Sequence, residues 1–238
     1  MLLGISKGGF AGLGMAGTVI LANAVSPIQA IGILLPIQMV QDIFTVYNYR
    51  KEWSGRILAI ALPGAVAGVA LAYGVASYVS ALAIMLLIGV VSIVFALQQA
   101  LRRKPIQRTD APPRVIPGVL SGAASGFCSM IANAGGAPFQ IYILPLRLPP
   151  AIFVGTNAMF FAFMNWLKLI PIALLGQLSL GNLATSTALL PLAIASTWLG
   201  IWLIRRMSSA KFYPVITALL FCIGLRLLWT SAKGFGWM

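Results

Sequence analysis

Long apolar stretches recur along the whole chain, and short polar or basic segments separate them. Each stretch is close to the roughly 20 residues that an α-helix needs to cross a bilayer. No alternating pattern of about ten residues appears, so a transmembrane barrel is not indicated. The pattern predicts helical segments at about residues 2–22, 28–50, 55–77, 80–101, 115–146, 150–172, 181–204 and 209–230.

The amino-acid composition places these helices in a membrane. Of the 238 residues, 60% are hydrophobic and 8% are charged. This leaves too little polar surface to cover a soluble globule. The sequence therefore predicts an all-α integral membrane protein that crosses a membrane several times.

The net charge of +13 comes from basic residues that cluster between the apolar stretches. The clusters lie at residues 50–56, 102–114 and 205–211. Short basic loops of this kind normally stay in the cytoplasm, so the charge mainly reflects orientation and does not indicate a nucleic-acid surface. Contact between these loops and anionic headgroups makes membrane lipids expected partners.

The two halves of the chain resemble each other. Shifting one half by about 123 positions brings identical residues together. We therefore expect a first transmembrane repeat at 1–103, a basic cytoplasmic linker at 104–114 and a second repeat at 115–238, each repeat with about four helical segments. The matching first-half and second-half residues are Ala11, Gly12, Ile20, Leu21, Pro27 and Gly32 with Ala134, Gly135, Ile143, Leu144, Pro150 and Gly155.

Loop charges indicate that the second repeat is inverted relative to the first. With simple crossings, the basic loop near Arg205 would face the opposite side from the other basic loops, and the uncharged loop at 173–180 would be cytoplasmic. Both conflicts disappear if residues 115–146 cross and return as a hairpin. This segment is longer than one span needs and contains a glycine-rich interruption, so it can form a helix and a re-entrant half-helix.

Glycine-rich breaks interrupt apolar helices at matching points of the two repeats, at residues 7–12 and 132–138. The half-helix after a break begins with unpaired N–H groups and with the positive end of the helix dipole, which together suit an oxyanion. Two inverted breaks would bring two such ends to one site at the bilayer midplane. For the glycines in general, the alternative is close helix packing through small residues, as for Gly64 with Gly68.

Residues in and around the breaks are the candidate substrate ligands. Lys7 supplies positive charge directly beside the first break, and the glycines let a ligand approach the backbone amides. Thr156 and Asn157 begin a helix at a point that the repeat symmetry places toward the breaks, and their donors could replace the hydration of an oxyanion. The candidate set is Lys7, Gly8, Gly9, Gly12, Asn133, Gly135, Gly136, Gln140, Thr156 and Asn157.

Polar residues within the predicted helices form a candidate coupling path. Asp42 is costly in a membrane unless it is paired or faces water, and it could carry a coupling proton. Asn165 is its equivalent in the other repeat. The alternatives are that Asp42 pairs with Arg50 or Lys51 near the interface and that Lys168 extends to the headgroups. The path consists of Gln38, Asp42, Asn165 and Lys168.

The reactive residues argue against catalysis. The chain contains no histidine, three acidic residues and two cysteines, Cys128 and Cys222, which lie far apart in apolar segments. Metal catalysis and the usual catalytic triads lack their components, so we expect no metal and no cofactor. We therefore expect the protein not to be an enzyme.

Short motifs of glycine, proline and small residues recur in a fixed order along nearly the whole chain. They are Lys7-Gly8-Gly9-Phe10, Ser26-Pro27, Leu35-Pro36, Tyr49-Arg50, Leu62-Pro63-Gly64-Ala65, Gly135-Gly136-Ala137-Pro138 and Gly155-Thr156-Asn157. In this order and spacing they resemble the TauE/SafE sulfite exporter family of membrane permeases. The resemblance implies secondary transport of small anions, with sulfite and organosulfonates such as sulfoacetate as the best-known classes, usually outward across the cytoplasmic membrane.

We therefore expect a secondary-active transporter that exports a small inorganic or organic sulfur anion by alternating access, with protonation of Asp42 coupled to the change of state. Two other classes share parts of this pattern. A passive anion channel would use the same helix ends, and a non-transporting membrane scaffold or assembly factor would share the composition and the duplication. A homodimer is one assembly that such a protein could form.

Overall fold

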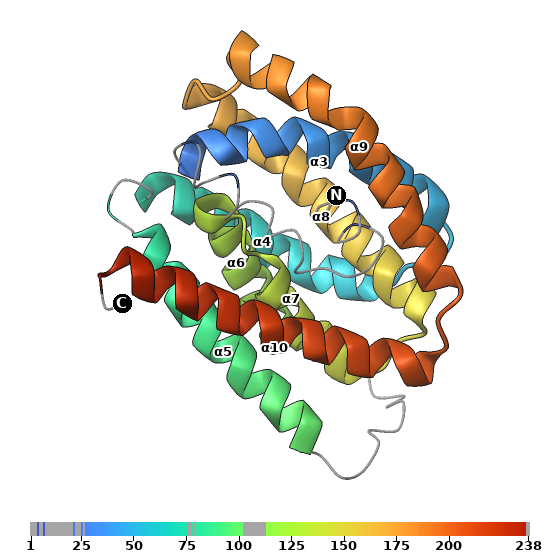
Figure 1. Ribbon diagram of the computed structural model, residues 1–238. Helices are drawn as coiled ribbons and strands as arrows, with labels where there is room; N and C mark the ends of the chain where they lie inside the picture. Colours follow the sequence, from blue (N-terminus) through green and yellow to red (C-terminus); the bar gives the residue numbers. More distant parts are fainter. Residues whose placement is uncertain are drawn as a thin grey trace. The chain divides into compact units, whose positions relative to one another are not determined.

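All regular elements in the part of the chain that the computed structural model describes are helical (Figure 1). The described residues are Gly4, Lys7, Leu21, Val25 and residues 27–75, 78, 80–101 and 113–236. The elements are α3 (Pro27–Tyr49), α4 (Gly55–Val75), α5 (Ala81–Leu101), α6 (Val115–Ala132), α7 (Gly136–Ile143), the 3-10 helix η1 (Leu144–Leu146), α8 (Pro150–Leu174), α9 (Leu180–Arg205) and α10 (Ser209–Gly234).

The helix bounds confirm the prediction from the apolar pattern. From α3 onward, each predicted segment coincides with an observed helix to within a few residues. The predicted segment 115–146 is split into α6, α7 and η1, as the expected break requires. The predicted first helix at 2–22 lies outside the described residues apart from Gly4, Lys7 and Leu21.

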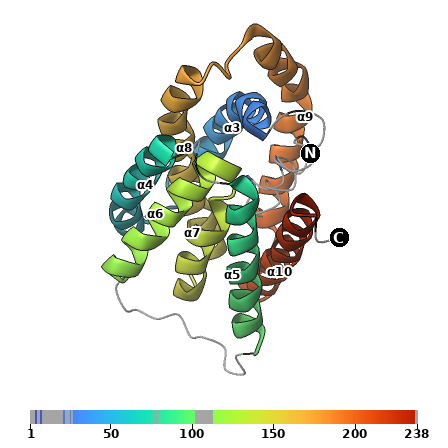
Figure 2. The same cartoon turned by 90° about the vertical axis from the view of Figure 1, so that its left-hand side faces the viewer.

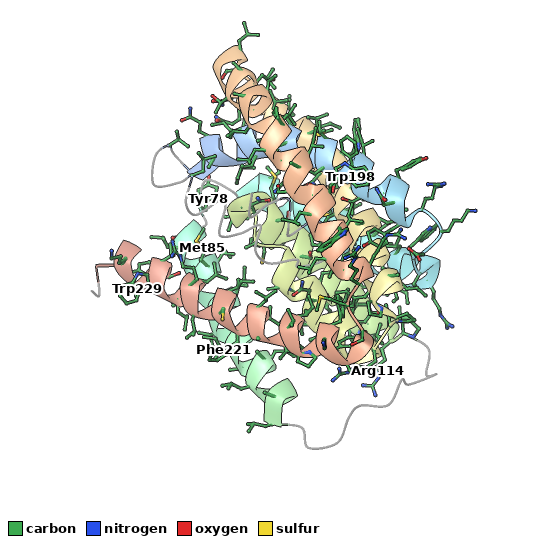
Figure 3. All side chains as sticks on the ribbon, turned by 45° about the vertical axis from the view of Figure 1, so that its right-hand side comes forward. Tyr78, Met85, Arg114, Trp198, Phe221 and Trp229 are labelled. Carbon is green, nitrogen blue, oxygen red and sulfur yellow. The ribbon has the colours of Figure 1, made fainter. Side chains whose placement is uncertain are left out.

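Large apolar side chains cover the outside of the helices. Leu71, Leu87 and Ile170 have exposed fractions of 60%, 62% and 65%. Figure 3 shows Trp198 on α9 and Trp229 on α10 among the side chains, and both are about half exposed. Six of the described helices, α3, α4, α6, α8, α9 and α10, are long and apolar enough to cross a membrane. Together these features identify a multi-pass membrane protein.

The chain divides into two compact units. Unit 1 comprises Met1–Leu58 and Ala151–Met207, and unit 2 comprises Ala59–Pro150 and Ser208–Met238. Unit 1 therefore holds α3, α9 and nearly all of α8, whereas unit 2 holds most of α4 together with α5, α6, α7 and α10. Each unit combines helices from both halves of the sequence.

In unit 1, α3 lies between α8 and α9 (Figure 2). Inside α3, Asp42 accepts a hydrogen bond from Asn165 of α8. Earlier in α3, a Cβ atom built on Gly32 would lie 2.7 Å from the carbonyl oxygen of Gln177, which follows α8. The earlier residue of α3 therefore contacts the later residue in sequence, at or beyond the end of α8. The two helices α3 and α8 are thus antiparallel.

Side-chain hydrogen bonds fix the register of α3 and α9. The separation in sequence of the bonded residues stays at 152 or 153 along both helices, so the two helices are parallel. Such bonds satisfy polar groups inside apolar segments, where water cannot do so. The bonds are Gln29 Nε2 to Asn182 Oδ1 (3.1 Å), Ser186 Oγ to the Ile33 carbonyl (2.7 Å) and Gln41 Nε2 to the Ala193 carbonyl (3.1 Å).

Glycines bring α4 and α6 together in unit 2. A Cβ atom built on Gly64 or Gly68 would lie 2.1 Å from a carbonyl oxygen of α6, and one built on Gly122 would lie 2.0 Å from a carbonyl oxygen of α4. No residue with a side chain can make this approach, so the two backbones touch directly. This geometry confirms the alternative interpretation of these glycines as helix-packing residues.

A second pair of helices in unit 2, α5 and α10, is antiparallel and closely packed (Figure 1, Figure 2). Near the start of α5, the Leu82 carbonyl accepts a hydrogen bond of 3.0 Å from Ser231 Oγ, near the end of α10. Farther along, a Cβ atom built on Gly89 would lie 3.0 Å from the Gly224 carbonyl oxygen. Small residues therefore set the spacing of this pair as well.

Candidate functional site

Asp42 is the centre of a buried polar cluster in unit 1. Lys7 Nζ donates to Oδ1 of its carboxylate in an ion pair, and Asn165 Nδ2 donates to Oδ2 at 2.6 Å. The side chain of Asp42 is 2% exposed and that of Lys7 is 12% exposed. Each carboxylate oxygen thus has a donor, which is the condition under which a buried charge is tolerated.

Lys168 adds a second positive charge to this cluster. It lies one turn after Asn165 on the same helix, is 1% exposed, and interacts electrostatically with both Asp42 and Lys7. Glu52 is the other described acid. Its Oε2 lies 3.7 Å from Nη2 of Arg205, in a half-exposed ion pair outside this cluster. Among the described residues, two lysines therefore share one carboxylate, and the cluster has an excess of positive charge when both are ionised.

The pairing of Asp42 corrects one sequence-based alternative. Asp42 pairs with Lys7, 35 positions away, and not with Arg50 or Lys51. Arg50 is about 12 Å farther along the helix. Its guanidinium donates to the Tyr47 carbonyl at 2.7 Å and lies over the Tyr47 ring. The local interactions of Arg50 are thus made with its own helical turn.

Other polar side chains of unit 1 extend the cluster along the helices. The burial of Lys168 rules out the alternative that it extends to the headgroups. Gln38, one turn before Asp42, is 7% exposed. Gln41 was not predicted: it is fully buried, donates to the Ala193 carbonyl, and its Oε1 has no hydrogen-bond partner among the described residues. The signal for it was its position directly beside Asp42 in an apolar helix.

The Gly155-Thr156 element of α8 holds the turn between α3 and α4. A Cβ atom built on Gly155 would lie 1.8 Å from the Glu52 carbonyl oxygen, so only glycine fits. Thr156 Oγ1 accepts a hydrogen bond from Ser54 N at 3.0 Å and donates to the Ile152 carbonyl at 2.7 Å. Because its hydroxyl hydrogen is used inside α8, Thr156 positions the turn in this conformation.

The equivalent glycine of the first half makes an equivalent contact. Gly32 stands in α3 where Gly155 stands in α8, and it packs against the carbonyl oxygen of Gln177 in the segment between α8 and α9. Each glycine thus admits the backbone of the segment that follows the other helix. The two contacts have the same form on either side of the Asp42 to Asn165 hydrogen bond.

Asn157 lies on the buried face of α8, two turns before Asn165. It is 5% exposed, and its Nδ2 donates to the Phe153 carbonyl at 2.9 Å. Its Oδ1 is buried and has no hydrogen-bond partner within the described part of the chain. Asn157 therefore offers an acceptor inside unit 1, whereas its amide donor is engaged with its own helix.

The second glycine-rich break forms a tight turn between α6 and α7. Asn133 follows α6 in the left-handed conformation, with φ 50° and ψ 32°, which asparagine tolerates better than most residues. Asn133 N donates to the Ser129 carbonyl at 3.2 Å, the bond of an αL C-cap, and Ala134 N donates to the Cys128 carbonyl at 3.1 Å. Asparagine thus ends the helix, whereas Gly135 permits close approach, because its Cβ would lie 2.5 Å from the Ser125 carbonyl oxygen.

α7 returns along α6 in the opposite direction. With eight residues it is about 12 Å long and cannot cross a bilayer by itself. The chain therefore comes back toward the end of α6 at which it entered, which confirms the expected hairpin. The bonds that join the two arms are Ser125 Oγ to the Gly135 carbonyl (2.6 Å), Ser121 Oγ to the Pro138 carbonyl (2.8 Å) and Tyr142 Oη to the Arg114 carbonyl (3.1 Å).

The predicted site residues fall into three groups. Unit 1 contains Lys7, Gln38, Asp42, Thr156, Asn157, Asn165 and Lys168. Unit 2 contains the hairpin residues Asn133, Gly135, Gly136, which begins α7, and the fully buried Gln140. Gly8, Gly9 and Gly12 lie outside the described residues. The structure thus joins Lys7, Asp42, Asn165 and Lys168 in one cluster, and the ligand roles of all these residues stay predictions.

Comparison with known proteins gives one match. Residues 1–227 match the family described as Sulfite exporter TauE/SafE. The match includes every helix from α3 to α9 and most of α10. No curated protein and no solved structure matches the chain.

Proposed function

Because the chain belongs to the sulfite exporter TauE/SafE family, we propose that it is a secondary-active transporter of small sulfur oxyanions, sulfite or an organosulfonate. It exports the anion across the cytoplasmic membrane and is not an enzyme. The multi-pass helical architecture and the family support a transporter of sulfur oxyanions, and the chemistry of the Asp42 cluster supports an anion as the substrate.

The excess of positive charge at the Asp42 cluster carries this proposal. Lys7 and Lys168 share a single carboxylate among the described residues, and Lys168 is 1% exposed. Two ammonium groups beside one carboxylate repel each other, and buried charged side chains inside a membrane protein often line an ion path. A small anion bound beside both lysines would offset this repulsion. The cluster therefore favours an anion over a cation or a neutral substrate.

The relation of α3 to α8 supports a carrier mechanism based on inverted repeats. Asp42 and Asn165 are 123 positions apart, the interval that relates the two halves, and they meet where two antiparallel helices cross. Gly32 and Gly155 make equivalent contacts on either side of that point. Equivalent residues meet in this way around a two-fold axis in the membrane plane. Such a repeat gives two conformations of similar energy, as alternating access requires.

We assign the coupling role to Asp42. While its carboxylate is ionised, it neutralises one lysine of the cluster; when it takes up a proton, the positive charge of the cluster rises by one. Anion binding and protonation at this site therefore favour each other, and by linkage the effect is reciprocal. An Asp42→Asn variant whose flux kept the full pH dependence of the wild type would remove this role.

Counterflow in proteoliposomes tests the proposed function. Vesicles loaded with unlabelled sulfite should take up 35S-labelled sulfite transiently above equilibrium, and the initial rate should saturate with external sulfite. A passive anion channel would equilibrate the label without overshoot and without saturation at low substrate. A membrane scaffold would give the flux of empty vesicles. Sulfoacetate, an anion, and taurine, a zwitterion, in place of the internal sulfite identify which class of sulfonate is exchanged.

A further inference from the structure

A pocket of about 500 Å³ lies in unit 2 where α5, α10 and the turn after η1 meet. Its walls are mostly apolar and include Leu97 of α5 together with Ala218 and Phe221 of α10. Three polar residues, Arg147, Tyr213 and Thr217, also line it, and the Thr217 hydroxyl donates to the Tyr213 carbonyl within α10. All of these residues belong to unit 2, whereas the Asp42 cluster belongs to unit 1. The pocket is therefore a feature separate from the proposed anion site.

Arg147 is held at this pocket by its surroundings. The carbon at the centre of its guanidinium lies 4.5 Å from the centroid of the Tyr213 ring. Tyr213 Oη in turn donates to the Leu148 carbonyl, which fixes the ring. The Nε of Arg147 is buried and has no hydrogen-bond partner among the residues that the structure describes. A positioned guanidinium with an unused donor is suited to a phosphate or carboxylate.

The pocket lies at the basic end of unit 2. The end of α5 and the start of α10 come together in the antiparallel pair, and Lys211 lies in the first turn of α10. Tyr142 Oη donates to the Arg114 carbonyl, so the chain that leads to Arg147 returns to the start of α6. Figure 2 shows α5 ending and α6 beginning toward the same side of this unit. Basic helix ends normally face the cytoplasm, where anionic lipids are in contact with them.

The lining favours an occupant with a large apolar part over a small hydrated anion. Most of its residues are alanine, leucine, proline or phenylalanine, which offer nothing to replace the hydration of an oxyanion. An acyl chain loses no hydrogen bonds when it enters such a space and gains packing contacts. A molecule with an apolar chain and a phosphate would satisfy both the walls and Arg147.

We propose that this pocket binds an anionic phospholipid, with an acyl chain between α5 and α10 and the phosphate on Arg147. Figure 3 shows Phe221 on α10 and Met85 on α5, the two helices that would flank the chain. The lipid would bridge α5, α10 and the end of the hairpin. The bound lipid therefore stabilises unit 2, and this site is independent of the exported anion.

Native mass spectrometry of the purified protein tests this assignment. The full chain in detergent is titrated with phosphatidylglycerol or with phosphatidylcholine of identical acyl chains. We expect phosphatidylglycerol to bind about tenfold more tightly, because a charge-assisted contact distinguishes the headgroups. Arg147→Gln should remove the preference, whereas Arg226→Gln, which deletes an exposed arginine of α10 outside the pocket, should keep it.

A second pair of variants tests the acyl-chain part of the pocket. Ala218→Phe fills the pocket from an exposed position and should weaken both lipids, whereas Val215→Phe places the same aromatic side chain outside the pocket and should leave binding unchanged. Equal affinity of the wild type for the two lipids, or an unchanged preference in Arg147→Gln, would overturn the proposal. Displacement of phosphatidylglycerol by glycerol phosphate at equal concentration would also overturn it, since the site would then recognise free phosphate.

Discussion

Asp42 of α3 and Asn165 of α8 are joined by a hydrogen bond of 2.6 Å, and the 123 positions between them are the interval that relates the two halves of the sequence. A carboxylate and its amide equivalent thus face each other where the two antiparallel helices cross. The asymmetry of the pair places the single negative charge of the cluster on one half. Exchanging the two residues therefore tests whether their positions are equivalent, which removing either side chain alone does not.

The first prediction concerns this exchange. Asp42→Asn removes the carboxylate that Lys7 and Lys168 share, and we expect a loss of about 3 kcal/mol in unfolding free energy. Asn165→Asp places two carboxylates together and should also destabilise the protein. The double variant restores one carboxylate and one amide, so it should recover a large part of the thermal stability. A double variant as unstable as the sum of the single variants would argue against a two-fold relation at this point.

Gly155 gives a prediction on packing. A Cβ at this position would meet the Glu52 carbonyl at 1.8 Å, and a backbone atom cannot move away without disrupting the turn. Gly155→Ala should therefore lower the unfolding free energy by about 3 kcal/mol or prevent folding. Gly74→Ala is the matched control, because nothing lies within 4 Å of its added Cβ. Thermal unfolding in detergent of the two variants should differ clearly; equal stability would contradict the packing seen at Gly155.

Thr156 separates a positioning role from a ligand role. Thr156→Val removes two hydrogen bonds and should cost about 1–3 kcal/mol, whereas Thr156→Ser keeps the hydroxyl and should retain most of the stability. Thr185→Val, which removes an exposed hydroxyl bonded to the Gly181 carbonyl, serves as control. If Thr156 only positions the turn, the Ser variant binds anions like the wild type and the folded Val variant does so as well. A folded Val variant that no longer binds anions would instead show that the hydroxyl contacts the substrate.

Asn133 allows a similar separation in the hairpin. Its φ of 50° suits glycine better than any other residue, so Asn133→Gly should fold as well as the wild type. Asn133→Ala should cost about 1 kcal/mol, because alanine is strained in the left-handed region. Anion-induced stabilisation of the Gly variant then reports on the side chain alone. Wild-type anion binding by this variant would remove Asn133 from the predicted ligand set.

The helices and the hairpin could be predicted from the sequence because lipid restricts the options. A chain with so few charges must form membrane-spanning helices, and 115–146 was too long and too interrupted for one span. The structure confirms both expectations. The residue that ends α6 could not be predicted in the same way, because the sequence pattern attributes the break to its glycines. In the structure, Asn133 adopts the left-handed conformation and Gly135 allows close packing.

The pairing within the cluster was predicted only in part. Asp42, Asn165, Lys7 and Lys168 were all recognised as candidates, but Asp42 was assigned Arg50 or Lys51 as an alternative partner because these are near in sequence. Contacts between residues 35 and 123 positions apart depend on helix packing, which no local pattern encodes. The available signal was the repeat itself, since equivalent residues of inverted repeats can meet on the axis that relates them.

The central claim, that the Asp42 cluster binds a small anion through its excess positive charge, is tested most directly by thermal unfolding of Lys168→Gln. Sulfite at about 100 times its dissociation constant should stabilise the wild type by about 2.7 kcal/mol, and potassium chloride of equal ionic strength should not. The control Lys233→Gln, which removes an exposed lysine of α10, should respond like the wild type. Lys168→Gln should be at least as stable as the wild type without sulfite, because a like charge beside Lys7 is gone, and should gain nothing from sulfite, sulfate, thiosulfate or sulfoacetate. Equal stabilisation of Lys168→Gln and the wild type by sulfite, or stabilisation of the wild type by cations alone, would contradict the account.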